Sequence, residues 1–135
     1  MTEAEITFQI SEYLNRVWEM QQWWASISLG VLVMAHMASE RLNLLIVTIS
    51  LALYTSYTLY MNQMAGENYD TIFALAADLQ KLIDLGVVNS HSAKEVASLS
   101  ATDATLYLVT MGGTYISVVS YLIYSYMRAR RAESA

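Results

Sequence analysis

The chain has 135 residues, of which 56% are hydrophobic and 14% are charged, with a formal net charge of −5 and no cysteine or proline. A soluble domain carries about 25% charged residues, so this composition excludes an ordinary water-soluble globule and a disordered chain, and the negative charge argues against a nucleic-acid partner. The charges also avoid three long runs, residues 20–39, 42–66 and 104–127. This pattern predicts an all-α membrane protein with three transmembrane helices in a single membrane domain, residues 1–135.

Residues 2–22 are expected to form an N-terminal amphipathic helix. Thr2 and Glu5 have the spacing of a capping box, in which each side chain bonds to the backbone N–H of the other. Apolar residues then recur at steps of three and four, from Ile6 and Ile10 to Val17, which is the helical period. We expect this helix to lie at the membrane interface or to extend from the bundle.

The first two spans are predicted at residues 18–37 and 42–61. Tryptophans cluster at the start of the first span and mark the water boundary, because indole rings prefer the headgroup layer. The short polar turn at residues 38–41 makes the second span antiparallel to the first. The second span is about 30 Å long at 1.5 Å per residue, which matches the hydrocarbon core. Gly66 is expected to end its helix.

Residues 67–103 are the largest polar region and are predicted to form an extracytoplasmic helical hairpin between spans two and three. Gly86 is the expected end of the first helix of the hairpin. A second capping-box pattern, Ser92 and Glu95, predicts the start of the next helix. The third span follows at residues 104–127, and residues 128–135 form a tail.

Arginines set the expected orientation. Arg41, Arg128, Arg130 and Arg131 lie close to span ends on one side, so the positive-inside rule predicts a cytoplasmic C-terminus and an extracytoplasmic N-terminus in the cell (inner) membrane. The first 19 residues lack a basic region typical of a signal peptide. Because three spans are predicted, membrane lipid is an expected partner.

The spans contain hydroxyl and amide groups but no charged residue, which argues against proton relays and ion-coupled carriers. Two interpretations of these polar groups stay open. They can line a pore, or they can form hydrogen bonds between helices, worth about 0.6 kcal/mol each on average in a membrane. The candidate pore-lining residues are Thr48, Thr55, Asn62, Thr110, Thr114 and Ser117.

Small residues in the third span predict a close helix contact. Gly112, Gly113, Ser117 and Ser120 contain a small-xxx-small pattern, which lets two backbones approach closely. The contact can be made within the chain or between subunits, and both alternatives stay open.

Each of the two histidines precedes a glutamate by four residues, as His36 with Glu40 and His91 with Glu95. Residues four apart share a helix face, but two ligands are too few for a closed metal site, so local ion pairs are expected and no metal or other cofactor is predicted. His36 with Glu40 is also a candidate pH-sensitive pair, since histidine titrates near neutrality. No nucleophile–base pair or phosphate-binding loop is present, so an enzyme is not expected.

These features lead to two functional hypotheses. The first is a small homo-oligomeric multi-pass protein that forms a cation-permeable channel, with an acidic outer vestibule that concentrates cations. The alternative is a non-conducting accessory or scaffold subunit of a larger membrane-protein complex, bound through its hairpin or its glycine ridge.

Overall fold

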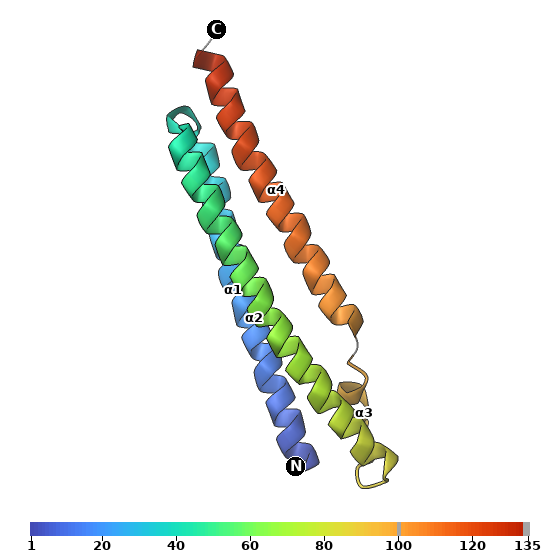
Figure 1. Cartoon of the computed structure of the whole chain (residues 1–135). Helices are drawn as coiled ribbons and strands as arrows, with labels where there is room; N and C mark the ends of the chain where they lie inside the picture. Colours follow the sequence, from blue (N-terminus) through green and yellow to red (C-terminus); the bar gives the residue numbers. More distant parts are fainter. Residues whose placement is uncertain (100, 134–135) are drawn as a thin grey trace. The chain divides into compact units, whose positions relative to one another are not determined.

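The computed structural model describes residues 1–99 and 101–133, with residues 101–103 and 133 described by their backbone alone. The expected all-α class is confirmed, because 90% of the described residues are helical. The elements in chain order (Figure 1) are α1 (Glu3–Met37), the short 3-10 helix η1 (Ser39–Arg41), α2 (Leu44–Asp84), α3 (His91–Ala97) and α4 (Ala101–Glu133). Among the residues that the structure describes, two segments are long and apolar enough to cross a membrane, α2 and the Ala104–Ala132 part of α4.

The helices divide into two compact units. Unit 1 consists of Met1–Gln21 and Gln63–Tyr107, and unit 2 consists of Gln22–Asn62 and Leu108–Ala135. Unit 1 contains ten acidic and three basic residues, whereas the charges of unit 2 are confined to positions 40–41 and 128–133. The two units therefore differ in charge as well as in residue content.

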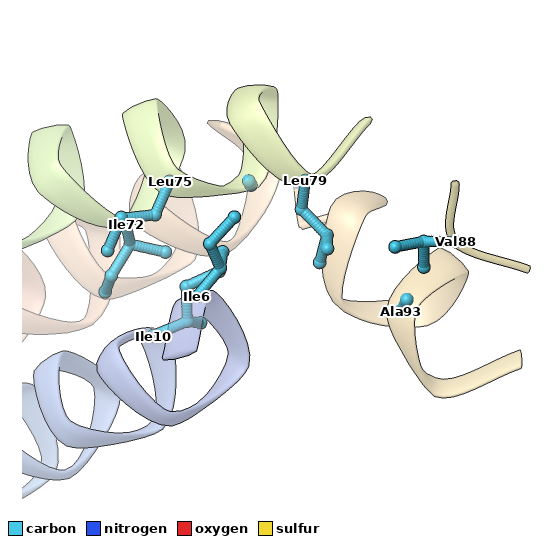
Figure 2. Packing of buried hydrophobic residues seen from close by; sticks show 8 residues of the cluster. Ile6, Ile10, Ile72, Leu75, Leu79, Val88 and Ala93 are labelled. Atoms are coloured by element: carbon cyan, nitrogen blue, oxygen red, sulfur yellow. The ribbon is translucent and has the colours of Figure 1, made fainter. Parts of the chain in front are cut away.

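Unit 1 has an apolar core of the kind found in water-soluble helical proteins. Figure 2 shows Ile6 and Ile10 on α1 facing Ile72 and Leu75 on α2, with Val88 and Ala93 close together at α3. Leu79 is fully buried in the same cluster. The spacing of Ile6 and Ile10 is one helical turn, so one face of α1 supplies both, while the acidic side chains of this segment remain at the surface.

The predicted capping box at the start of α1 is confirmed by two hydrogen bonds. The Thr2 backbone N–H donates to Glu5 Oε2 at 2.7 Å, and the Glu5 N–H donates to Thr2 Oγ1 at 3.3 Å. Hydrogen bonds to the Glu5 carboxylate, first from the Thr2 backbone N–H and then from the Thr2 hydroxyl, lower the pKa of this carboxyl below its usual value. The sequence pattern therefore locates this helix start correctly.

The end of α2 is set by Gly86, as expected, and not by Gly66. Gly86 has φ +72, in the left-handed region. The N–H groups of Val87 and Val88, which follow it, donate to the carbonyl of Leu82, which precedes it. This is the geometry of an α-helix that ends at a residue in the left-handed conformation. The expectation that the helix ends at Gly66 is wrong, because α2 continues through it. A helical glycine costs about 1 kcal/mol relative to alanine, and the burial of Ala65 and Asn68 on either side stabilises the continuous helix.

The start of α3 also differs from the prediction. Its N-cap is Ser90, whose hydroxyl accepts a hydrogen bond from the Ala93 N–H at 3.1 Å, rather than Ser92 with Glu95. Ser90 also donates to the Glu3 carboxylate of α1. This contact joins residues 87 positions apart in the sequence, so a local capping pattern could not reveal it.

Unit 2 exposes many large apolar side chains on its surface. The exposed ones on its three helices include Leu29, Val33, Leu45, Leu53, Val109 and Ile116. Its interior combines an apolar cluster of Ala35, Leu42, Val47 and Leu122 with buried hydroxyl groups of Ser28, Tyr54 and Ser125. In water such a surface would be unfavourable, because large contiguous apolar patches are rare on soluble monomers.

Candidate functional site

A set of hydrogen bonds between helices fills the centre of unit 2. Trp24 Nε1 on α1 donates to Thr58 Oγ1 on α2 at 3.2 Å, and Ser28 Oγ shares a hydrogen bond of 2.8 Å with Tyr54 Oη. These bonds connect α1 to α2 through side chains that have no charge. They satisfy polar groups that would otherwise be costly to bury.

A second contact connects α2 to α4. Thr55 Oγ1 and Tyr115 Oη share a hydrogen bond of 2.7 Å, and the Tyr115 ring stacks on Tyr54 with centroids 5.5 Å apart. Stacked aromatic pairs contribute about 0.5–1.5 kcal/mol beyond their buried area. Tyr54 therefore contacts both neighbouring helices and lies at the centre of the unit.

A groove of ≈ 320 Å³ lies between α2 and α4, next to the Thr55–Tyr115 bond. The side chains that line it are uncharged, namely Thr55, Thr58, Leu59, Asn62, Leu108, Met111, Gly112 and Tyr115. It brings together two predicted pore-lining residues, Thr55 and Asn62, and one predicted packing glycine, Gly112. The mixture of hydroxyls and apolar walls suits an uncharged ligand with both polar and apolar parts.

The remaining pore-lining candidates do not line this groove. Thr110 and Ser117 are exposed on α4, and at 100° per residue both lie far around the helix from Tyr115. Thr48 is exposed on α2, and Thr114 is half-buried. A single chain thus does not bring the six candidates into one pathway.

The small residues of α4 also face open space within the chain. A Cβ added at Gly112 or Gly113 would meet no heavy atom within 4 Å in the described structure. Ser117 and Ser120 are exposed, and the Ser117 hydroxyl donates to the carbonyl of Gly113 in its own helix at 2.8 Å. The described residues therefore show no close packing of another helix against these two glycines.

A second cavity of ≈ 360 Å³ lies in unit 2 where α1 and η1 meet the last turns of α4. It contains both members of the predicted pH-sensitive pair, His36 and Glu40. His36 Nδ1 shares a hydrogen bond of 2.8 Å with Tyr121 Oη on α4. The contact partner of His36 is therefore Tyr121, 85 residues away in the sequence, whereas the pattern of positions four apart points to Glu40.

None of the α4 residues that line this cavity was predicted as a site residue, and Tyr121, Ser125 and Arg128 are among them. These three recur at steps of four and three, the helical period, and end at the first arginine after the third apolar run. That pattern is a usable signal for a polar face at the end of a span. The second histidine, His91, lies 3.7 Å from Glu95 in an exposed pair in unit 1.

The two sites of unit 2 thus differ in chemistry, since the groove is uncharged and the cavity contains a cationic and an anionic side chain. Among the described residues, no group of three or more histidine or acidic side chains is placed to hold a metal ion. No protein-family model, curated protein or solved structure matches this chain.

Proposed function

We propose that the chain is a multi-pass membrane protein that assembles with copies of itself into a cation-permeable pore. The membrane placement is supported by the surface of unit 2, on which large apolar side chains such as Leu29, Leu53 and Ile116 are exposed. Of the 18-residue apolar stretches in α2 and α4, only 17% and 22%, respectively, are buried within the protein. Lipid is the solvent that can cover the remaining surface at no hydrophobic cost.

Three crossings are proposed, at residues 18–37, 42–61 and 104–127. The first is supported by the α1 residues of unit 2, because Leu29 and Val33 are exposed while Trp24 and Ser28 are buried in polar contacts. This is the same apolar-out pattern that α2 and α4 have. The N-terminus and the hairpin at 67–103 would be extracytoplasmic and the C-terminus cytoplasmic, in agreement with the arginine distribution.

The crossings can be tested with single cysteines, because the natural chain has none. Cysteines at Leu29, Leu53 and Ile116 are expected to resist a membrane-impermeant maleimide in proteoliposomes, whereas a cysteine at Leu85 reacts. All four side chains are exposed in the isolated chain, Leu29 at 61% and Leu85 at 75%, so only lipid would protect the first three. Rapid labelling at Leu29 alone would reduce the number of crossings to two.

The main observation in support of a pore is the exposed polar face of α4. Thr110, Gly113, Ser117 and Ser120 recur at steps of three and four and are all exposed, so they lie on one side of a helix apolar enough to cross the membrane. Against lipid this side makes few favourable contacts. A second copy of the chain would cover it, and hydroxyl groups at such an interface can surround a water-filled path.

Cation preference follows from the charge of unit 1. Its ten acidic and three basic residues would form the outer vestibule of each subunit. A ring of such subunits raises the local cation concentration at the pore mouth. Lowering the salt concentration should therefore increase the preference for cations over anions.

Two leucine substitutions at adjacent glycines provide a matched test of the pore. Gly113→Leu places a large side chain on the exposed polar face, whereas Gly112→Leu places it on the side of the α2–α4 groove, and a Cβ added at either glycine meets no heavy atom of another helix within 4 Å. We expect Gly113→Leu to reduce the mass of the detergent-solubilised particle and abolish cation flux into liposomes, and Gly112→Leu to preserve both. Flux that is absent from the natural chain, or equal in the two variants, would contradict the pore.

The alternative function is a non-conducting accessory subunit. One observation favours it: Thr55, a predicted pore-lining residue, is bonded to Tyr115 and so contributes to the contact between helices. An accessory subunit would purify at a fixed stoichiometry with a different membrane protein and give no flux by itself. Gly113→Leu would then release that partner, and a mixture of tagged and untagged copies would not co-purify.

A further inference from the structure

The charged cavity of unit 2 continues into an apolar groove along α1. The cavity is lined by His36, Glu40, Tyr121 and Arg128 among others. The groove, with a volume of ≈ 480 Å³, is lined by Leu32, Val33, His36, Met37 and Tyr121. His36 and Tyr121 belong to both, so their hydrogen bond of 2.8 Å stands at the junction between a polar and an apolar compartment.

The cavity presents one positive and one negative side chain that do not neutralise each other. Arg128 and Glu40 both line it, yet they form no ion pair within 4 Å in the described part of the chain. Both are exposed, so a ligand can reach them without displacing either. A ligand that carries an anion and a cation a short distance apart complements this pair, whereas a singly charged ligand would face one repulsive partner.

The groove offers a surface for hydrocarbon. Val33 and Met37 are exposed at 46% and 80%, and at a four-residue step they lie on one face of α1 with Leu32 beside them. Burial of hydrocarbon contributes about 0.8 kcal/mol per CH₂ when it leaves water. A ligand with a dipolar head and an apolar tail would therefore match both compartments.

We propose that this composite site binds one phospholipid with a phosphoethanolamine headgroup. The phosphate bonds to the Arg128 guanidinium, the ammonium bonds to the Glu40 carboxylate, and an acyl chain lies along Leu32, Val33 and Met37. Arginine is well suited to the phosphate because its planar fork donates two hydrogen bonds. A trimethylated ammonium has no N–H to donate to Glu40, and a glycerol headgroup has no positive charge.

The inference rests on the proposed membrane placement, because it needs the cavity at the level of the headgroups. The cavity residues agree with that level. Arg128 follows the charge-free run 104–127, and Glu40 lies in the turn between the runs 20–39 and 42–66. Both charges thus lie where each apolar run ends.

Native mass spectrometry of the full chain in detergent, with defined lipids added, tests the site. We expect one phosphatidylethanolamine per chain to be retained about tenfold more strongly than phosphatidylcholine or phosphatidylglycerol with the same acyl chains, since loss of one charge-assisted bond corresponds to about a factor of ten or more. Arg128→Gln should remove this retention. Arg130→Gln is the control, because it deletes the same charge two residues along α4 at a position outside the cavity.

Glu40→Gln should change the lipid preference of the site and not merely weaken lipid retention. Without the carboxylate the site would have a net positive charge, so its preference should change from phosphatidylethanolamine to phosphatidylglycerol. Glu19→Gln, in an exposed position of unit 1, should leave the preference unchanged. For the acyl chain, Val33→Ser should weaken retention, while Leu29→Ser, on α1 outside the groove, should not.

Three results would overturn the proposal. The first is equal retention by Arg128→Gln and Arg130→Gln. The second is an unchanged preference in Glu40→Gln. The third is displacement of the phospholipid by glycerophosphoethanolamine at the same concentration. This compound lacks acyl chains, so its success would mean that the groove plays no part in binding. These results would refute the lipid site alone, as long as the chain is still recovered with the membrane fraction. Recovery of the natural chain in the aqueous fraction would instead refute the proposed membrane placement.

Discussion

The hydrogen bond between Ser28 and Tyr54 allows a quantitative test of the unit 2 interior. The two oxygens are 2.8 Å apart, and the side chains are only 2% and 3% exposed. Ser28 Oγ also donates to the Trp24 carbonyl of its own helix at 2.8 Å. A serine hydroxyl has one proton, so Tyr54 is the donor in the bond between the helices.

This donor assignment predicts unequal effects of the two deletions. Tyr54→Phe removes a donor, and Ser28 keeps its bond to Trp24, so no proton is left without an acceptor. Ser28→Ala instead removes the acceptor of a buried tyrosine hydroxyl, which carries a desolvation cost of about 1–3 kcal/mol. We expect Ser28→Ala to lower the free energy of unfolding more than Tyr54→Phe does.

A double-mutant cycle measures the bond itself. In a membrane environment the coupling between the two side chains should be about 0.6 kcal/mol, and at most about 1.7 kcal/mol. The assay is equilibrium unfolding of the protein in mixed micelles, followed by circular dichroism, for the natural chain, both single variants and the double variant. A coupling of zero, or a larger loss from Tyr54→Phe than from Ser28→Ala, would refute the assigned contact.

Three further predictions concern unit 1 and its helix ends. Leu79→Ala, at a fully buried position, should lower stability by about 2–5 kcal/mol, whereas Leu85→Ala, at an exposed position, should change urea unfolding little. Gly66→Ala should stabilise α2 by about 0.5–1 kcal/mol, because glycine is less stable than alanine inside a helix. Gly86→Ala should destabilise α2 by about 1 kcal/mol, because φ is +72 at this position. Both effects are measured as shifts in melting temperature. The lowered pKa of Glu5 means that its contribution is present above the unfolded carboxyl pKa and is lost as pH falls through the folded value. The protection factors of the first-turn amides, which correct for the intrinsic pH dependence of exchange, should therefore fall at acidic pH in the natural chain and depend less on pH in Glu5→Gln.

Local sequence patterns predicted the helix ends where the partner groups are close in the chain. Thr2 and Glu5 are three residues apart, and Gly86 acts through its own backbone angle, so both signals are complete within one turn. The same reasoning failed at Gly66, because a glycine is only a weak helix breaker when packing on both sides stabilises the helix. It also failed at Ser92, because the cap is Ser90, whose hydroxyl bonds to both the Ala93 N–H and the Glu3 carboxylate.

The candidate sites were predictable only as far as one helix determines them. The face of α4 that contains Gly113 and Ser117 follows from helical spacing alone. The partners of His36 and Thr55 do not, since they are tyrosines 85 and 60 residues away. Spacing identifies which residues share a face, but only packing determines which other helix that face meets.

The strongest structural argument for a membrane is that two boundaries of different origin agree. The charge-free runs, 20–39, 42–66 and 104–127, follow from the order of residues. The bounds of unit 2, 22–62 and 108–135, follow from which residues contact each other. The charge-free runs begin or end within four residues of the places where unit 1 gives way to unit 2, whose surface exposes large apolar side chains such as Leu29, Leu53 and Ile116. A helical protein in water gains nothing by exposing large apolar side chains where its charges stop, whereas a chain whose helices pass from water into lipid can expose them there, because lipid imposes no hydrophobic cost on an apolar surface.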